Sequence, residues 1–211
     1  MTSSMNRPAL SNTAANHRIL RLCVFCGSRS GNGPAYLSAA EHLGRELSAA
    51  GITLVFGGGR VGLMGGLANA VLSTGGRVIG VIPKSLVEKE IAHTSLTELH
   101  IVNSMHERKA RMADLADAFV LLPGGFGSWE EFCEIFTWLQ LGIHRKPCGI
   151  LNVAGYYDAL VQQASRAVSD GFVPASHLES LMIETSSRRL LARLAAAPVL
   201  QETKWISKQE R

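Results

Sequence analysis

The sequence has no long apolar run, and its first acidic residue is Glu41. No stretch approaches the roughly 18 residues that a membrane-spanning helix needs, so we expect no association with a membrane. Residues 1–17 are rich in Ser, Asn, Thr and Ala without an apolar core, which argues against a secretory signal. The lack of acids hints at a transit peptide, but arginine is too sparse there. We therefore expect a disordered tail at 1–18 and a cytoplasmic protein.

Charged residues are also few, at 18% of the chain against 46% hydrophobic residues. This balance excludes intrinsic disorder of the whole chain, and 211 residues are enough for one sizeable core. The net charge is +4, but the basic residues are scattered and form no Lys/Arg block. We therefore expect no nucleic-acid partner. A single domain at 19–197 and a polar C-terminal tail at 198–211 are predicted.

Cysteine is limited to four residues, at positions 23, 26, 133 and 148. Cys23-x-x-Cys26 has the spacing of a redox or zinc motif, but no second pair follows at zinc spacing. The pair also falls on a predicted strand, where positions three apart point to opposite faces. Buried free thiols are therefore predicted, with no metal site.

Apolar strands alternate with amphipathic helices along the chain. Several of the strands are continuous apolar runs, which is typical of parallel strands buried on both faces. This alternation predicts an α/β fold, a Rossmann-like doubly wound parallel sheet with helices on both faces. The expected strands are Arg21 to Cys26, Ile52 to Phe56, Arg77 to Ile82, His100 to Val102, Ala118 to Leu122, Cys148 to Val153 and Leu181 to Glu184. The expected helices are Pro34 to Ala50, Leu63 to Ser73, Met105 to Leu115, Ser128 to Leu141, Tyr157 to Ser169 and Ser187 to Ala196.

Glycine is present in excess, with 21 residues, and it clusters where strands are predicted to end. Because ligands of doubly wound folds bind beyond the carboxyl ends of the strands, these clusters should face one crevice. Gly57-x-Gly59-x-x-Gly62 matches a dinucleotide fingerprint, but the acid expected about 20 residues later is missing. Two interpretations remain open: close helix–strand packing, or approach of a phosphate or sugar to bare backbone.

The last glycine cluster leads into a predicted helix that starts at Ser128, followed by Glu130 and Glu131. The N–H groups and positive dipole end of that helix suit a phosphate. Ser128-x-x-Glu131 is also a capping box, so Glu131 has a structural interpretation as well as a functional one.

A second polar motif, Met105-His106-Glu107-Arg108-Lys109, opens another predicted helix. Charged residues this close together usually form a solvated helix face. If they lie at the same crevice, Arg108 and Lys109 could instead bind a phosphate or polarise a base.

In order and spacing, these three motifs resemble the LONELY GUY family of cytokinin riboside 5'-monophosphate phosphoribohydrolases, long misnamed lysine decarboxylases. The resemblance covers about residues 19 to 195. One departure is Ser128, where the family usually has threonine, and serine keeps the hydroxyl.

The resemblance implies a Rossmann-like homodimer without a cofactor that releases a free base and ribose 5-phosphate from an adenine nucleotide 5'-monophosphate. The preferred base carries an N6-isoprenoid chain, although some members also accept AMP. Arg108 and Glu131 match catalytic positions. The implied substrate contacts are Glu90, Arg108, Lys109, Gly124, Gly125, Phe126, Gly127, Ser128, Trp129, Glu130 and Thr137. Backbone approach to the phosphate is expected at Gly27, Ser28, Gly58, Gly59 and Met64.

The chemistry is consistent with these roles. N-glycosidic cleavage develops positive charge on ribose, which a carboxylate such as Glu131 can stabilise while activating water, with Glu130 holding ribose hydroxyls. Arg108 is expected to stabilise the leaving base or to bind phosphate.

Three alternatives compete with this hydrolase. A lysine decarboxylase would need a Schiff-base lysine, for which Lys84, Lys109 and Lys146 are the candidates. A broad AMP nucleosidase would differ only in base preference. A non-enzymatic nucleotide carrier would use the same glycine turns without paired carboxylates.

Overall fold

The core of the protein is a parallel sheet with strand order β4-β3-β2-β1-β5-β6-β7. It is seen in a computed structural model that describes residues 18–87 and 92–198. Every neighbouring pair of strands is parallel, which confirms the predicted doubly wound sheet. The strands are β1 Arg21–Phe25, β2 Thr53–Phe56, β3 Val78–Pro83, β4 Glu98–Val102, β5 Ala118–Leu121, β6 Cys148–Leu151 and β7 Leu181–Glu184.

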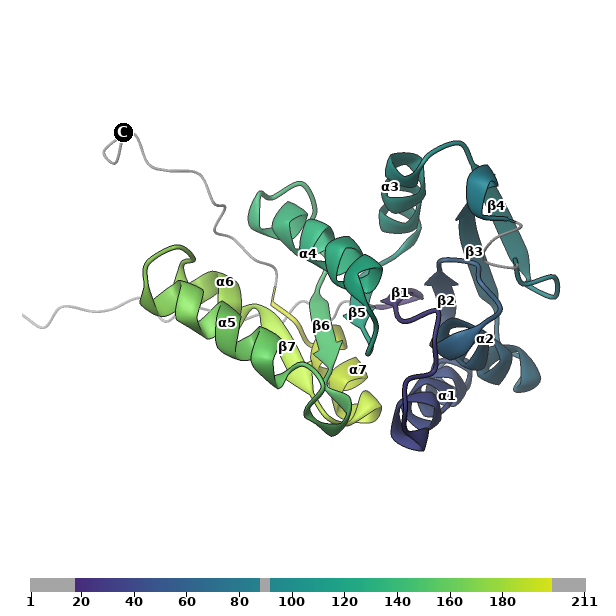
Figure 1. The fold of residues 1–211 in the computed structure, drawn as a ribbon, viewed down its shortest axis with the longest axis horizontal. Helices are drawn as coiled ribbons and strands as arrows, with labels where there is room; N and C mark the ends of the chain where they lie inside the picture. The colour runs from purple at the N-terminus through teal and green to yellow at the C-terminus, as the bar shows by residue number, and fades with distance from the viewer. Residues whose placement is uncertain (1–17, 88–91, 199–211) are drawn as a thin grey trace, which may run out of the picture.

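Helices cover both faces of the sheet (Figure 1). One face carries α1 (Pro34–Ala49), α2 (Gly62–Ser73) and α7 (Ser187–Ala195). The other carries α3 (Met105–Leu115) and α4 (Phe126–Gln140), with α5 (Asp158–Ser169) and α6 (Ala175–Glu179) toward β7. Short 3-10 turns follow two strands, η1 at Lys84–Leu86 and η2 at Val153–Gly155. Within the described residues, no helix is both long and apolar enough to cross a bilayer.

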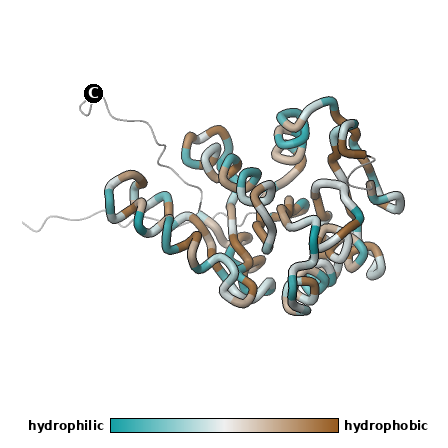
Figure 2. The backbone as a smooth tube through the Cα atoms, viewed as in Figure 1, coloured by the Kyte–Doolittle hydropathy of each residue, from teal (hydrophilic) through white to brown (hydrophobic). Residues whose placement is uncertain are grey.

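Two hydrophobic cores lie on opposite sides of the sheet, because the strands present apolar side chains to both faces. All residues of β5 and β6 are buried, and so are all but the first of β1. Hydrophilic and hydrophobic residues alternate along the helices, as expected for amphipathic helices with one face toward the core (Figure 2). Cys23 packs in one core and Cys26 in the other, which confirms that they point to opposite faces.

The strand order reverses between β1 and β5. From β1 the chain adds β2, β3 and β4 on one side, and β5 then pairs with the other edge of β1 before β6 and β7 follow. The loops after β1 and β5 therefore leave the sheet side by side, and a hydrogen bond of 3.0 Å joins Gly27 N to Pro123 O. Such a switch point is where ligands of doubly wound folds bind.

Element boundaries differ from the predicted ones by at most two residues, and one of these differences is informative. Helix α4 begins at Phe126 rather than Ser128, with Gly125 as its extended N-cap residue and without a side-chain cap. The predicted capping box of Ser128 and Glu131 is therefore wrong, because both residues lie inside the helix. The low helix propensity of glycine at 127 hid this first turn. Helix α6 was missed for its shortness.

Gly62 offers a test of how tightly the loop after β1 packs against α2. Its φ of +60° is left-handed, and a Cβ there would overlap the backbone of Ser28 and Arg29. Gly51 has a similar φ of +67° with no atom within 4 Å. We expect Gly51→Ala to lose about 1–2 kcal/mol from backbone strain alone. Gly62→Ala should lose roughly 2–5 kcal/mol, because backbone cannot yield to the added carbon. Equal losses in urea unfolding would contradict this packing.

His144, in the loop between α4 and β6, links stability to pH. Its Nε2 lies 2.9 Å from Ile135 O, and its Nδ1 accepts the Lys146 N–H at 3.1 Å, so the neutral ring satisfies both contacts. Burial lowers the pKa of His144, and the nearby charge of Lys146 lowers it further, against the opposing effect of the Ile135 carbonyl.

The neutral histidine therefore contributes stability that is complete above about pH 6.5 and is lost as the pH falls through the lower folded pKa. We expect His144→Gln to flatten the acid limb of a plot of unfolding free energy against pH. His106→Gln, an exposed substitution on α3, is the matched control. If the acid limb is unchanged in His144→Gln, the neutral histidine does not cause the loss of stability at low pH.

Candidate active site

A cavity of about 540 Å³ opens at the switch point between β1 and β5. Its size is within the range of small-molecule pockets. The wall is built from the loops after β1 and β5 and from the first turns of α2, α3 and α4. The residues that line it are Cys26, Gly27, Ser28, Arg29, Ser30, Gly31, Tyr36, Leu63, Met64, Leu86, Met105, Arg108, Pro123, Gly124, Gly125, Phe126, Gly127, Ser128, Glu131 and Tyr156.

The N-terminus of α4 faces this cavity. Phe126, Gly127 and Ser128 all line it, and the N–H groups of a first helical turn have no partner inside their own helix. Together with the positive end of the helix dipole, they form a site suited to an anion such as a phosphate. Glycine is required at 124, because a Cβ there would overlap the buried Ser128 hydroxyl.

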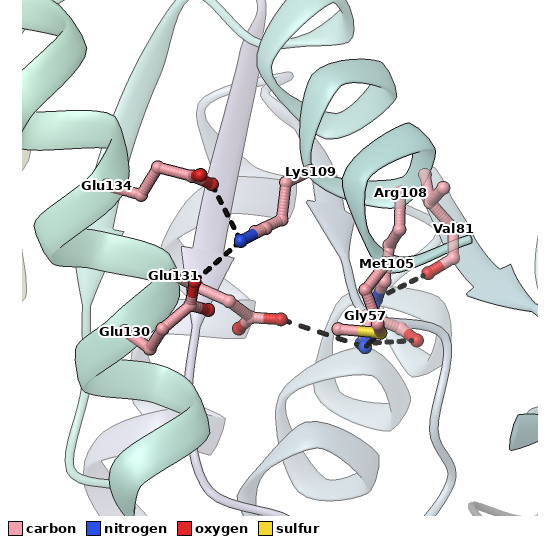
Figure 3. Close-up of polar contacts among 8 residues, drawn as sticks. All are labelled: Gly57, Val81, Met105, Arg108, Lys109, Glu130, Glu131 and Glu134. Carbon is pink, nitrogen blue, oxygen red and sulfur yellow. Dashed lines mark hydrogen bonds and ion pairs between the residues drawn. The ribbon is translucent and has the colours of Figure 1, made fainter.

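Arg108 reaches the cavity from α3 and is only 5% exposed. Its Nε donates to Val81 O at 3.1 Å and its Nη2 donates to Gly57 O at 3.1 Å, so the guanidinium is fixed to β3 and to the end of β2 (Figure 3). Glycine at 57 lets the guanidinium take this position, because a Cβ there would collide with Nη2. The first glycine of the Gly57-x-Gly59-x-x-Gly62 motif therefore makes room for a cation.

Glu131 lines the cavity one helical turn beyond the N–H groups of α4. Its Oε1 lies 3.7 Å from Nη1 of Arg108, and its side chain is 13% exposed (Figure 3). The cavity thus brings together a carboxylate, a guanidinium and a helix N-terminus. Arg108 and Glu131, both predicted as catalytic from the resemblance, come from α3 and α4 and meet here.

The cysteines next to this site are not nucleophiles. Burial, and then the negative charge of Glu131, raise the pKa of both Cys23 and Cys26, so these thiols stay protonated. All four cysteines are free thiols, and Cys23, Cys26 and Cys148 are buried as predicted. The prediction is wrong for Cys133, which is exposed because it lies on the outer face of α4.

Lys109 lies beside Arg108 but does not line the cavity. Its Nζ lies 2.6 Å from Oε1 of Glu130 and 2.9 Å from Oε2 of Glu134, two residues of α4 (Figure 3). Burial alone would lower the pKa of Lys109, but the two carboxylates outweigh it and raise the pKa, so the ammonium stays charged. In this chain Lys109 joins α3 to α4.

The other predicted residues separate into two groups. Gly27, Ser28 and Met64 line the cavity with the segment from Gly124 to Ser128. Trp129, Glu130 and Thr137 do not line it, and Glu90 lies outside the described residues. The Thr137 hydroxyl donates to Cys133 O within α4 and is exposed, as Glu130 is. Glu130, Cys133 and Thr137 thus share the outer face of α4.

Gly58 and Gly59 lie outside the cavity too. Gly58 packs against Ile82 and Leu99, and Gly59 forms a bridge with Ala92. At the start of α2, the N–H groups of Leu63 and Met64 donate to Gly27 O at 3.1 and 3.3 Å. Part of this helix N-terminus is therefore used by the protein itself, in contrast to that of α4.

The aromatic and apolar part of the wall was not predicted from the sequence. Tyr36, Leu86, Met105 and Tyr156 line the cavity. Met105 stands in a motif that had been noted only for its charges, and Tyr156 follows β6, another strand that ends near this edge of the sheet.

The lysines do not favour a Schiff-base enzyme. Lys146 donates to Ala113 O at 2.6 Å, Lys109 is paired with Glu130 and Glu134, and Lys84 is exposed on η1. In the described part of the chain, no lysine lines the cavity. A cluster of three metal-ligating side chains is also absent from the described residues.

Known proteins resemble this chain at two levels. The three-dimensional fold resembles that of the molybdenum cofactor binding protein from the phototrophic bacterium Rippkaea orientalis, with a TM-score of 0.63 and 19% identity over 83% of this chain and 94% of that one. The molybdenum cofactor carrier protein of Chlamydomonas reinhardtii has a TM-score of 0.63 and 17% identity over 83% of this chain and 95% of that one. At such identity the likeness concerns the fold alone.

Similarity in sequence is much closer. Residues 64–194 match a family model described as possible lysine decarboxylase. A probable cytokinin riboside 5'-monophosphate phosphoribohydrolase of Oryza sativa subsp. japonica is 56% identical over 160 residues, covering 76% of this chain and 70% of the relative. A cytokinin riboside 5'-monophosphate phosphoribohydrolase of Arabidopsis thaliana is 49% identical over 177 residues, 84% of this chain and 82% of the relative. The chain therefore belongs to the LONELY GUY family of cytokinin riboside 5'-monophosphate phosphoribohydrolases.

Proposed function

We propose that the protein hydrolyses the N-glycosidic bond of N6-substituted adenine riboside 5'-monophosphates to the free cytokinin base and ribose 5-phosphate. One observation carries this proposal: Glu131 and Arg108 stand side by side in a cavity that also contains the N-terminus of α4. The names of the relatives agree with this reaction. A non-enzymatic carrier would have no use for a carboxylate paired with a buried guanidinium in its binding cavity.

The 5'-phosphate binds at the first turn of α4. The N–H groups of Phe126, Gly127 and Ser128 and the Ser128 hydroxyl are the donors, and Gly27 and Gly124 allow the phosphate to approach the backbone. Helix N-termini bind phosphates in this way because donors and dipole act together.

The ribose then lies next to Glu131, one turn further along α4. As the bond between the anomeric carbon and the base nitrogen breaks, its electron pair leaves with the base, and positive charge grows on the sugar. The Glu131 carboxylate stabilises this charge and accepts a proton from water. The resulting hydroxide bonds to the anomeric carbon, and the proton is passed to the departing base.

Arg108 stabilises the negative charge on the leaving base. Its Nη1 lies 3.7 Å from Oε1 of Glu131, the carboxylate assigned to the sugar, which favours a role at the scissile bond. Since two backbone carbonyls fix the guanidinium in advance, little reorganisation is needed when charge develops.

The mouth of the cavity suits a base with an apolar substituent. Met105 is 40% exposed and Phe126 is 83% exposed, and both line the cavity with Leu86. Burying this exposed apolar surface against an isoprenoid chain is favourable, and bare AMP offers no such contact.

A homodimer is part of this proposal. Glu130 and Thr137, two substrate contacts implied by the family, lie on the exposed face of α4, outside the cavity of one chain. A second copy packed against this face would bring these residues to a shared active site.

Incubation with isopentenyl-AMP and with AMP tests the reaction itself. We expect free base and ribose 5-phosphate in equal amounts from both nucleotides. The kcat/KM for isopentenyl-AMP should be higher by roughly 10-fold or more, because each buried CH₂ contributes about 0.8 kcal/mol. Chromatography of the base, with an assay for the sugar phosphate, measures both products. Release of base from neither nucleotide would refute the hydrolase assignment.

Glu131→Gln tests the role of the carboxylate, because glutamine keeps its shape without its charge. We expect kcat to fall by about 10²–10⁴-fold, the usual contribution of general acid–base catalysis. The melting temperature should also fall, because Glu131 faces the buried guanidinium of Arg108, so kcat is compared at a temperature where both proteins are folded. Glu179→Gln, at an exposed glutamate of α6 outside the cavity, is the control. Turnover of Glu131→Gln near the wild-type rate would exclude this role.

A further inference from the structure

The turn after β6 is strained and firmly held. Within the described residues, Ala154 is the single non-glycine residue with a left-handed backbone, at φ +51°, and Gly155 follows at φ +70°. Asn152, which is buried, ties the turn together: its Oδ1 accepts Tyr157 N at 2.8 Å, and its Nδ2 donates to Asp158 Oδ1 at 2.7 Å. Strain of this kind persists only where the surroundings enforce it, and it gathers at functional sites.

The turn presents two consecutive tyrosines to the loop after β5. The Tyr157 hydroxyl donates to Leu122 O at 2.8 Å, and the Tyr156 hydroxyl donates to Gly124 O at 2.7 Å. The two rings stand at 85° to each other with centroids 4.8 Å apart. Tyr157 is 1% exposed and packs in the core, whereas Tyr156 is 39% exposed and lines the cavity.

Tyr156 also contacts the start of α1. Its ring meets that of Tyr36 edge-on, at 5.6 Å between centroids and 75° between planes. Gly31, in the loop after β1, lies so close to the Tyr36 ring that a Cβ would collide with it. The two tyrosine rings therefore connect the loops that follow β1, β5 and β6.

The hydrogen bond to Gly124 O matters because this carbonyl could otherwise rotate toward the N-terminus of α4. Gly124 and Gly125 are joined by a peptide flanked by two glycines, which rotates more freely than any other. In a trans peptide the C=O and N–H point in opposite directions, so rotation by 180° would exchange their places. A carbonyl oxygen turned toward the donors at the α4 N-terminus would repel an anion bound there.

We propose that Tyr156 is a positioning residue, whose hydroxyl holds the Gly124 carbonyl so that the turn before α4 keeps its donors aimed at the 5'-phosphate of the substrate. This inference rests on the proposed function for the identity of the anion. Tyr157 lies deeper: its hydroxyl donates to Leu122 O and also contacts the Gly124 backbone, but it leaves the Gly124 carbonyl to Tyr156 and does not line the cavity.

A pair of hydroxyl deletions separates these roles. Tyr156→Phe keeps the ring contact with Tyr36 and removes only the bond to Gly124 O. We expect it to raise the KM for isopentenyl-AMP roughly 3- to 10-fold, as the loss of one hydrogen bond allows, with kcat changed by less than about twofold. The Ki of ribose 5-phosphate as an inhibitor should rise by the same factor. Tyr157→Phe should instead lower the melting temperature and raise KM less than Tyr156→Phe does, because the Gly124 carbonyl keeps its hydrogen bond.

Titration calorimetry with AMP keeps this test separate from the test of the reaction. If wild-type protein binds AMP without cleaving any nucleotide, the proposed hydrolysis fails, and a weaker affinity in Tyr156→Phe still supports the positioning role. Equal affinity of wild type and Tyr156→Phe overturns that role, as does a fall in kcat and melting temperature with KM unchanged. Absence of AMP binding to the wild type overturns both proposals.

Discussion

The parallel pairing of β1 with β5 is the constraint on which the rest of the structure depends. Its register, with Phe25 opposite Leu121, brings two chain segments about a hundred residues apart to the same edge of the sheet. The Gly27 N–H then meets the Pro123 carbonyl, and the helices that follow, α1 and α4, diverge to opposite faces. A space is left between their first turns, and side chains from α3 and the turn after β6 close it. The cavity is thus a consequence of strand order, and its chemistry depends on what the neighbouring elements supply.

Burying Arg108 is an electrostatic demand that this arrangement makes on the fold. A guanidinium removed from water is costly unless its donors are satisfied. Here the carbonyls of Val81 and Gly57 take two of them, and the Glu131 carboxylate adds an opposite charge at 3.7 Å. The same groups that make the burial tolerable also fix the cation and the carboxylate in one geometry. A transition state with opposite charges on sugar and base would find both partners already in place.

The architecture could be predicted from the sequence, because the spacing of apolar residues separates strands from helices clearly. Parallel strands joined by helices then leave few topologies open. The sequence was less informative about the site: motifs identified candidate residues, but only the fold showed which of them lie together. The capping box at Ser128 and Glu131 was wrong because Gly125, which offers no side chain, is the N-cap residue. The fingerprint glycines split into one that accommodates Arg108 and others that pack against neighbouring backbone and side chains. Tyr156 gave no local signal, since its partner Gly124 is 32 residues away in the sequence.

Glycine at the turn before α4 creates a conflict that the rest of the structure has to resolve. Gly124 has no side chain because Ser128 and the loop after β1 occupy the space where one would lie. The same absence leaves its peptide free to rotate, and a binding turn that rotates must be ordered again each time a ligand binds. The conformational preferences of glycine cannot fix this peptide, so its order has to come from a contact with a residue distant in the sequence. A hydroxyl on a strained turn can supply it, because the strain is borne by Ala154 and the turn is held by Asn152, both outside the turn that needs to be rigid.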